Sequence, residues 1–472
     1  MGVLLSIYEI CYSEREYSNM RLTHLMIKNY RLFAELALDF HPELTVIVAP
    51  NGCGKTTVLD AIRVAYSPYL FVFPTGRGSG IEPGDVHMIK TLEELGQMEP
   101  VTPVEIYADG TFDGQLAGTW KREKYSLKGR TTIKDARLPA EFGKTLQKHA
   151  TNGEFSKWPL IAYYGTGRLW NQKKLTDKKA FASGFHSRAA GYTDCMEPAS
   201  SYKLFLGWFS YASRSDNQVK LRFIEKTPSA SAKDIAEIEG PFTGLIQAVQ
   251  RAVNIVLAPT GWGDIHFSET IGSPTVQHPK FGTLQVDQMS DGIRNTLALA
   301  ADIAYRCVQL NAHLGENAVT ETEGIILIDE VDMHLHPEWQ QLILGSLRNA
   351  FPALQFIVTT HSPQVLTTVP PECIRELNWV GDTVQVDIPD FSLGAESPQI
   401  LESIQGVNPR PQQLDIVKKL NRYLELVGKD EWDGPEAKAL RIELDAWGAG
   451  HETALAKADI DIRMRSFRRR HA

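Results

Sequence analysis

The chain has 472 residues, of which 43% are hydrophobic and 22% charged, and its formal net charge is −8. This composition is typical of a globular protein of two or three domains, and the acidic balance argues against a protein that coats nucleic acid with its whole surface. Its 5 cysteines are scattered and no apolar run approaches the ~20 residues of a membrane span, which excludes a disulfide framework and favours a reducing, cytoplasmic setting without a membrane partner.

The first fifty residues divide into two parts. Residues 1–19 show no alternating pattern, so we expect them to be an extension that precedes the folded domain. From Met20 onward, the runs LTHLMI, AELALDF and LTVIVAP are strand-like. We expect these runs to form a small antiparallel layer that leads into the next motif.

The stretch from Leu44 to Thr57, LTVIVAPNGCGKTT, is an apolar strand followed by a glycine-rich loop and a helical pattern. This order is the context in which a phosphate-binding P-loop occurs, although Ala49 replaces its usual first glycine. Glycines let loop N–H groups face phosphate oxygens, and the helix directs its positive end at the same anion. Lys55 is predicted to contact the β- and γ-phosphates, and the Thr56 hydroxyl to bind Mg²⁺. The residues predicted to bind the nucleotide, ATP, are Pro50, Asn51, Gly52, Cys53, Gly54, Lys55, Thr56 and Thr57.

The middle of the chain is harder to interpret. The helix after the loop is expected over residues 57–66, ending near Ser67-Pro68, because proline disfavours a helical residue before it. Residues 68–270 read as a lid or insertion of helices and strands between two halves of one nucleotide-binding domain, 20–67 and 271–394. Within it, residues 121–179 carry 15 Lys and Arg against 5 Asp and Glu, which indicates either a solvated insert or a surface that faces nucleic acid.

Two later motifs carry candidate catalytic residues. Asp329 and Glu330 end the apolar run GIILI, a helix is expected from Pro337, and LQFIVTTHS is a further strand that ends near His361. Strand, helix and strand predict a parallel sheet, whose ligands bind at the carboxyl ends of the strands. We therefore assign Asp329 to Mg²⁺, Glu330 to the attacking water as general base, and His361 to the γ-phosphate side. The alternatives are an acidic pair that only caps the strand and a histidine that bonds the backbone.

The segment Ser290-Asp291-Gly292 is a second candidate anion site. Ser290 is expected at the N-cap of a helix within residues 285–310, where a serine and a glycine amide suit an anion. Because the P-loop already supplies one phosphate site, a second one indicates that Ser290, Asp291 and Gly292 complete the nucleotide pocket of a second copy. ATP would then join two subunits in a homodimer or higher homo-oligomer. The alternative is that Ser290 only caps its helix.

The motifs APNGCGKTT, MSDGIRN, ILIDEVDMHLHP and TTHS, in this order, resemble the Walker A, signature, Walker B and switch-histidine motifs of ABC-type ATPases. The likeness is to the RecF- and SMC-like, AAA_21-type branch, and the middle segment resembles the PtuA group of Septu and retron-Septu anti-phage defence. The resemblance implies an α/β fold with an antiparallel N-terminal layer, a parallel core sheet, a long α+β insertion and a helical C-terminal region.

The resemblance also implies a function. It predicts a nucleotide-gated ATPase dimer that controls a partner HNH nuclease, with Arg31 close to the nucleotide as in RecF- and SMC-like relatives. The signature reads S-D-G-I-R instead of S-G-G-Q, so slow turnover is expected.

Residues 395–472 are expected to be helices. They lack the acidic constellation of a TOPRIM nuclease, which favours a nuclease supplied by another chain that binds to these helices. DNA or a retron RNA–DNA component is a further candidate partner. The main alternative is a RecF-like DNA-repair ATPase that binds DNA itself through Lys121, Arg122 and Lys124; a transporter motor fits the long insertion poorly.

Overall fold

The computed structural model describes residues 20–92, 97–114, 116–168, 187–197, 202–448 and 450–471. The extension expected at residues 1–19 lies outside these described residues. The chain forms two compact units, Met1–Ala395 and Glu396–Ala472.

The first sheet of the larger unit is antiparallel, with strand order β2-β1-β6-β7. Its strands are β1 (Arg21–Tyr30), β2 (Phe33–Asp39), β6 (Val104–Asp113) and β7 (Leu116–Lys124). Side chains of β6 alternate between buried and half-exposed, as expected for a sheet with one face on the core. The antiparallel layer is therefore confirmed, but half of it comes from residues 104–124, inside the stretch expected to be an insertion.

The second sheet is the core of the unit, with strand order β15-β14-β3-β13-β12-β8. All its pairings are parallel except that of β14 with β15. The strands are β3 (Leu44–Val48), β8 (Leu160–Tyr164), β12 (Gly324–Ile328), β13 (Leu354–Thr359), β14 (Ile374–Val380) and β15 (Thr383–Asp387). Every residue of β3, β8, β12 and β13 is buried, which requires cover on both faces.

The strand β3 thus lies in the core sheet and not in the antiparallel layer, where the sequence pattern placed it. The physical reason is its burial pattern, because β3 is apolar and buried throughout whereas β1 and β2 alternate. β8, from the middle of the stretch 68–270, is likewise an edge strand of the core sheet. The parallel core sheet itself is confirmed.

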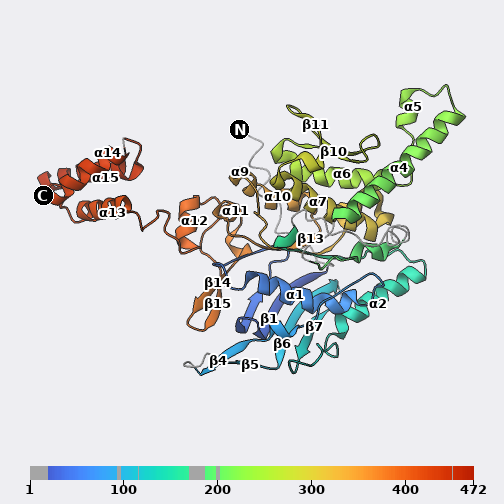
Figure 1. Cartoon of the computed structure of the whole chain (residues 1–472), viewed down its shortest axis with the longest axis horizontal. Coiled ribbons are helices and arrows are strands. Elements are labelled where there is room, and N and C mark those ends of the chain that lie inside the picture. The colour runs from blue at the N-terminus through green and yellow to red at the C-terminus, as the bar shows by residue number, and fades with distance from the viewer. Residues whose placement is uncertain are drawn as a thin grey trace. The chain divides into compact units, whose positions relative to one another are not determined.

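The helix α1 (Lys55–Leu70) packs between the two sheets, against β6 and β7 on one side and β13 on the other (Figure 1). It does not end before Pro68, as expected from the sequence, but continues to Leu70. A proline at this position leaves the carbonyl of Val64 without its helical N–H partner. The buried Arg122 of β7 donates a hydrogen bond to that carbonyl (2.9 Å), which explains why the helix tolerates the proline.

Helices cover the other face of the core sheet, where Figure 1 shows α6, α7 and α10. These are α6 (Thr243–Leu257), α7 (Asp291–Leu310) and α10 (Ile343–Ala350), joined by α4 (Tyr202–Lys226) and α8 (Ala318–Glu321). The helix α7 is buried along almost its whole length, so it lies at the centre of this helical layer.

The remaining elements of the larger unit are peripheral. They are β4 (Met88–Leu92), β5 (Gln97–Pro100), α2 (Arg137–Thr151), α5 (Ala232–Ala236), β9 (Gly263–Ser268), β10 (Ser273–His278), β11 (Gly282–Gln285), α9 (Pro337–Gln340) and α11 (Pro363–Leu366). Short 3₁₀ turns include Pro83–Asp85 and Arg188–Tyr192.

The smaller unit is helical, as expected. It comprises α12 (Ser397–Ser403), α13 (Asp415–Gly428), α14 (Pro435–Gly448) and α15 (Thr453–His471). The last three share a small core that includes Leu420, Leu444 and Leu455. Over the described residues of both units, none of the helices combines the length and the apolar character that crossing a bilayer demands.

Candidate functional site

The P-loop connects β3 to α1 and has the geometry of an anion cradle. Gly52 and Gly54 have φ angles of 79° and 98°, in the left-handed region that favours glycine. A Cβ atom on Gly54 would lie 2.2 Å from the ring of Phe33, so this position also excludes a side chain for steric reasons. The sequence of the loop therefore follows from both its backbone conformation and its packing.

The N–H groups of this loop are available to a ligand. From Asn51 to Thr57, the described structure pairs only the N–H of Cys53, which donates to the carbonyl of Pro50 (3.3 Å). The others surround the N-terminus of α1, where the helix dipole favours an anion. The residues present thus fit a polyphosphate.

Lys55 lies across the loop. Its Nζ donates to the carbonyls of Ala49 (2.8 Å) and Pro50 (3.2 Å), and the residue is only 7% exposed. Burial lowers the pKa of this lysine, while the nearby carboxylates of Asp329 and Glu330 oppose that shift. A phosphate at the loop would offer the ammonium group a charged acceptor in place of these carbonyls.

Asp329 lies at the end of β12 and joins three elements. Its Oδ2 accepts a hydrogen bond from the Thr56 hydroxyl at the start of α1 (2.8 Å), and its Oδ1 accepts one from the Thr359 hydroxyl at the end of β13 (2.6 Å). The side chain is buried, with 3% of the residue exposed. A hydroxyl and a carboxylate oxygen in direct contact are the donor set that Mg²⁺ takes beside a nucleotide, so Thr56 and Asp329 fit that metal.

Glu330 follows Asp329 and has a φ of 50°, which is unusual for a residue other than glycine. Its N–H donates to the Thr359 hydroxyl (2.8 Å), and the next N–H, of Val331, donates to the Thr359 carbonyl (3.0 Å). The chain turns sharply at this point and leaves the Glu330 residue half-exposed at the carboxyl edge of the sheet. Strained backbone of this kind is typical of functional sites.

His361 follows β13, which lies between the P-loop strand β3 and β12 in the sheet. Burial, and next to it the charge of Lys55, lower the pKa of His361, whereas Asp332, Glu330 and Asp329 raise it. The imidazole is therefore close to both the lysine and the acidic residues, and it is neutral near pH 7. The structure brings the P-loop, Asp329, Glu330 and His361 together at one edge.

Ser290 is the N-cap residue of α7, as expected, but its side chain makes no cap hydrogen bond. The alternative that the hydroxyl serves only as a helix cap therefore does not hold. Ser290 and Asp291 are exposed, and Asp291 forms a salt bridge with Arg294 (2.5 Å). Gly292 is required by packing, because a Cβ atom there would lie 2.3 Å from the carbonyl oxygen of His334.

Arg31 makes contacts that the sequence did not reveal. Its guanidinium group donates to Asp60 of α1 (2.6 Å) and to Asp85 of the turn Pro83–Asp85 (2.8 Å). These bonds hold the Arg31 side chain beside α1, more than one helical turn after Lys55. Its approach to the nucleotide stays a prediction.

Two threonines belong to the site although sequence reasoning missed them. Thr359 holds Asp329 and Glu330, and Thr360 donates to Asp332 (2.5 Å). The signal was present in the sequence, because both residues end a parallel strand next to the strand that carries the acids. Carboxyl ends of neighbouring parallel strands meet at one edge.

The basic residues between 121 and 157, within the described part of the stretch 121–179, include two groups. Lys121 pairs with Glu105 and Glu123, Arg122 is buried, and Lys124 donates to the carbonyl of Gly129. These three cations stabilise the fold, so the expectation that they bind DNA is wrong. The exposed members in the β7–α2 loop and on one face of α2 are Lys128, Arg130, Lys134, Arg137, Lys144 and Lys148, and Lys157 is also exposed but pairs with Glu321.

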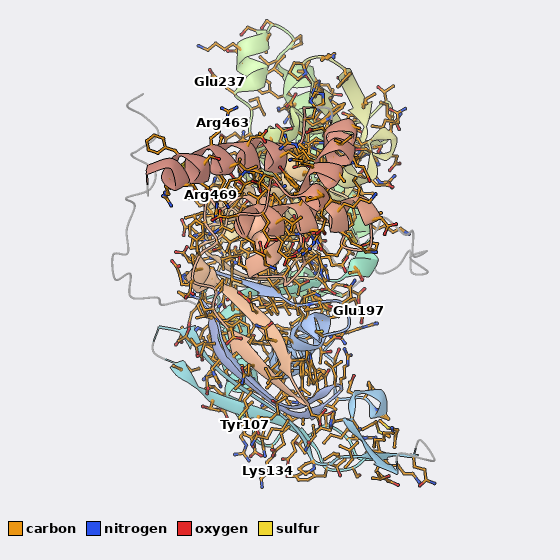
Figure 2. The ribbon with its side chains drawn as sticks, turned by 90° about the vertical axis from the view of Figure 1, so that its left-hand side faces the viewer. Tyr107, Lys134, Glu197, Glu237, Arg463 and Arg469 are labelled. Atoms are coloured by element: carbon orange, nitrogen blue, oxygen red, sulfur yellow. The ribbon has the colours of Figure 1, made fainter. Side chains whose placement is uncertain are left out.

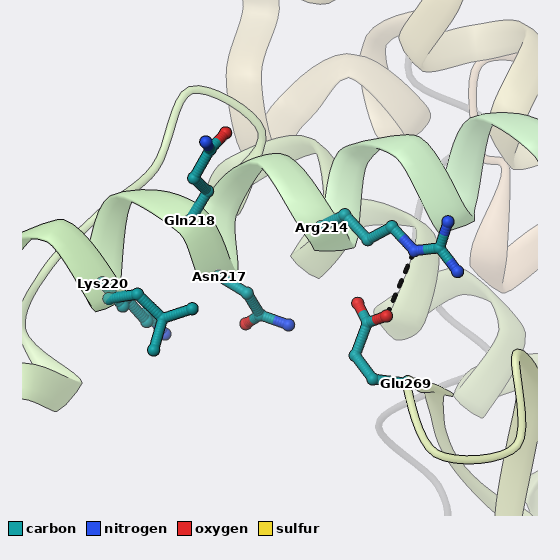
Figure 3. Close-up of a pocket in the computed structure, with 6 residues that line it drawn as sticks. Arg214, Asn217, Gln218, Lys220 and Glu269 are labelled. Carbon is teal, nitrogen blue, oxygen red and sulfur yellow. Dashed lines mark hydrogen bonds and ion pairs between the residues drawn. The ribbon is translucent and has the colours of Figure 1, made fainter.

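A surface hollow of about 450 Å³ lies elsewhere, along α4. Figure 3 shows Arg214, Asn217, Gln218 and Lys220 of α4 beside Glu269, with a hydrogen bond from Arg214 Nε to Glu269 (3.1 Å). Most of its lining residues are exposed. Its position on the insertion helix separates it from the P-loop edge.

Comparison with known proteins agrees with this geometry. The AAA_21 family model, described as "AAA domain, putative AbiEii toxin, Type IV TA system", matches residues 165–367, and the AAA_23 model, "AAA domain", matches residues 24–227. The "Retron Ec83 probable ATPase" of Escherichia coli is 26% identical over 97% of this chain and 89% of its own.

Two further similarities are more limited. The "Septu protein PtuA" of Bacillus mycoides is 47% identical over 17% of this chain and 10% of its own. The solved SMC head domain of Thermotoga maritima is 15% identical, with a TM-score of 0.42, over 79% of this chain and 100% of that domain. Together the two family models span residues 24–367, which contain every motif of the site. The chain is therefore similar to ATPase domains of the AAA_21 and AAA_23 kind, to the retron ATPases and, over a short segment, to PtuA.

Proposed function

We propose that the chain is the ATP-hydrolysing subunit of a cytoplasmic anti-phage defence complex, in which a nucleotide-gated homodimer controls a partner HNH nuclease. One observation supports the proposal of a dimer. The P-loop, Asp329, Glu330 and His361 lie together, whereas Ser290 is exposed at a helix N-terminus with no cap bond of its own. An exposed hydroxyl at a helix N-terminus suits the γ-phosphate of another subunit. The likeness to the retron ATPase and PtuA supports the defence role.

The chemistry follows from the contacts of the site. Loop N–H groups and Lys55 bind the β- and γ-phosphates; Thr56 and Asp329 would hold Mg²⁺, which would supply positive charge beside the phosphates. Glu330 accepts a proton from the attacking water, and the neutral imidazole of His361 orients that water or the γ-phosphate. Ser290 of the second copy completes the phosphate shell, so ATP holds the dimer closed until hydrolysis.

The test is a mass measurement of the chain co-expressed with the product of the neighbouring gene, which the proposal expects to be an HNH nuclease. We expect a complex whose mass increases with ATP and Mg²⁺, and nuclease activity that depends on the nucleotide. Lys55→Ala should abolish the ATP-dependent change, since it removes the phosphate-binding charge. A mass and nuclease activity that are the same with and without ATP would contradict nucleotide gating.

The partner-docking surface is proposed on the smaller unit, at residues 395–472. The outer side of α15 exposes Ile460 (56%), Met464 (53%) and Phe467 (63%), which share one helical face, while Leu455 and Ala458 pack in the core. The exposed cations that flank this face are Lys457, Arg463 and Arg468. Within the described residues none of the three forms a salt bridge, and Figure 2 shows Arg463 on this helix.

An apolar ridge edged by unpaired cations suits an acidic, amphipathic helix of a partner protein. Met464→Glu should reduce the amount of nuclease that co-purifies by about tenfold or more, as for a central interface residue. Ile442→Glu is the matched control, since Ile442 is also exposed (73%) but lies on α14. Equal effects of the two substitutions would remove α15 as the docking face.

A second candidate function is direct binding of DNA, or of a retron RNA–DNA component, as in a RecF-like ATPase. It is favoured by the six exposed cations of the β7–α2 loop and α2, among them Lys134, which projects at the surface in Figure 2. Arg137, Lys144 and Lys148 lie on the face of α2 opposite its buried Phe142 and Leu146. Such a row matches a phosphate backbone.

The test is the salt dependence of binding to a short DNA duplex. Replacing Lys144 and Lys148 with Gln should weaken binding and lower the slope of log affinity against log salt by about 1 for each lost phosphate contact. The control variant replaces Lys226 of α4 and Lys233 of α5 with Gln. Unchanged affinity and slope in the first variant would exclude this surface.

A further inference from the structure

Thr359 occupies a position that touches both acidic residues of the site. It is the last residue of β13 and is completely buried. The register of the sheet pairs Val358 with Ile328, so Thr359 lies beside Asp329 at the next position. A buried threonine at the end of a strand would otherwise be an ordinary β-branched packing residue.

The direction of its hydrogen bonds follows from the number of its protons. The N–H of Glu330 can only donate, so the Thr359 oxygen accepts that bond (2.8 Å). The single hydroxyl proton is then donated to Asp329 Oδ1 (2.6 Å). This bond occupies one carboxylate oxygen and directs the other, Oδ2, at the Thr56 hydroxyl (2.8 Å).

The same residue stabilises the turn at Glu330. The left-handed conformation of a glutamate is unfavourable by itself, and persists where surrounding contacts enforce it. The hydroxyl and the carbonyl of Thr359 accept hydrogen bonds from two successive N–H groups, those of Glu330 and Val331. One residue therefore determines both where the Asp329 carboxylate points and where the Glu330 side chain leaves the sheet.

We propose that Thr359 is a positioning residue for the metal carboxylate and the general base. The proposal rests on the proposed ATPase function and extends it to a residue outside the motifs. Thr359 is completely buried and acts through its contacts with Asp329 and Glu330. Outer partners of metal ligands typically contribute 10–100-fold to metal affinity or activity.

The experiment compares Thr359→Val, which keeps the shape and removes the hydroxyl, with Thr359→Ser, which keeps the hydroxyl. The readouts are the Mg²⁺ concentration at half-saturation for binding of a fluorescent, non-hydrolysable ATP analogue, and kcat. For Thr359→Val we expect about a 10–100-fold rise in that Mg²⁺ concentration and a similar fall in kcat, with binding of the analogue in the absence of Mg²⁺ unchanged. Thr359→Ser should restore the Mg²⁺ requirement and kcat to values close to those of the wild type.

Thr45→Val is the matched control, because Thr45 is also buried in the core sheet and its hydroxyl accepts a bond from the His41 N–H (2.9 Å), away from the acidic pair. Melting curves establish that each variant is folded, and Thr359→Ala serves if the valine variant is not. An unchanged Mg²⁺ requirement in the hydroxyl-free variant, or a serine variant as impaired as valine, would overturn the proposal. A wild-type chain that binds no nucleotide would instead refute the ATPase function.

Discussion

Glu330 combines partial exposure with an enforced left-handed backbone, so its carboxylate is displayed at the sheet edge while its main chain is held by Thr359. This is the arrangement expected of a general base, which must meet a water molecule without moving. In the proposed mechanism the adjacent residues Asp329 and Glu330 would have separate tasks, because the buried carboxylate suits a metal and the half-exposed one a water.

We expect Glu330→Gln to bind ATP normally and to reduce its turnover by about 10²–10⁴-fold, because the amide cannot accept the proton of the attacking water. ATP should therefore accumulate a stable nucleotide-bound dimer, measurable by size-exclusion chromatography with light scattering. Glu338→Gln, at an exposed acid on α9, is the control. Normal turnover in Glu330→Gln would assign the base to another group.

Glu376 on β14 supplies a prediction about pH. Burial, and in addition the charge of Asp387, raise the pKa of this carboxyl from 4.5 to about 7, while a hydrogen bond from Asn378 opposes the rise. Between pH 4.5 and 7 the unfolded chain has lost this proton and the folded chain still holds it. The stabilising contribution is therefore complete below pH 4.5, declines as pH rises through this window, and is lost above pH 7.

Glu376→Gln should consequently raise the free energy of unfolding at pH 8, by on the order of 1–2 kcal/mol after allowance for screening at the strand, and change it little at pH 4.5. Urea unfolding at the two pH values measures the difference. Glu141→Gln, at an exposed position on α2, should show no such dependence on pH. A parallel shift at both pH values would show that packing, and not ionisation, causes the effect.

At the scale of elements, the end of α1 depends on a residue from another strand. Arg122 donates to the Val64 carbonyl left unpaired by Pro68, and to the Thr132 carbonyl (2.9 Å). Burial alone lowers the pKa of this arginine to about 10, yet it stays charged at neutral pH. The proline and the arginine therefore compensate each other across the interface between α1 and the antiparallel sheet.

This compensation can be tested by a double-mutant cycle. Arg122→Met should destabilise the larger unit by about 1–3 kcal/mol, since it leaves buried carbonyls unsatisfied. Pro68→Ala restores an N–H for the Val64 carbonyl, so it should be more stabilising in the Arg122→Met background than in the wild type, by about 1 kcal/mol. Thermal unfolding of the four proteins gives the coupling. Strict additivity would mean that the two residues act separately.

The elements around the site could be predicted well because the sequence patterns that indicate them are local. An apolar run before a glycine loop, or before Asp329 and Glu330, carries strand, turn and chemistry within a dozen residues. The sheet partners of these strands were less predictable. β8 enters the core sheet beside β12 from residues far away in the sequence, and β6 and β7 complete a sheet begun by β1. Such pairings depend on tertiary packing, which alternation of side chains does not encode.

The same distinction applies to the candidate site. Lys55, Asp329, Glu330 and His361 could be predicted because each follows a recognisable strand. Thr359 carries only a weak signal, its place at the end of a parallel strand beside the acids, and a threonine there looks ordinary until its partners are known. Charge density alone was misleading for residues 121–124, where the cations pair within the fold.

At the scale of the whole molecule, the signature helix α7 is held firmly on its own subunit. Buried Asp302 accepts a hydrogen bond from the Tyr164 hydroxyl (2.8 Å), which links α7 to the end of β8, and a second one from Arg306 of the same helix (2.7 Å). Gly292 packs against the backbone of His334 at its N-terminus. Because both its middle and its end are fixed, Ser290 is held on the surface by its own chain, which suits a role toward a second copy.

Action across the dimer predicts complementation between two inactive variants. Ser290→Arg blocks the phosphate shell that a chain offers to its partner, and Lys55→Ala disables its own P-loop, so each homodimer should lack ATPase activity. A mixed dimer pairs the intact P-loop of the first variant with the intact Ser290 of the second and therefore has one complete site. With equal amounts and random pairing, half of the dimers are mixed, and the mixture should reach about a quarter of the wild-type rate. If Ser290 served its own P-loop instead, no mixed dimer would contain a complete site, and the mixture would be no more active than the parent variants.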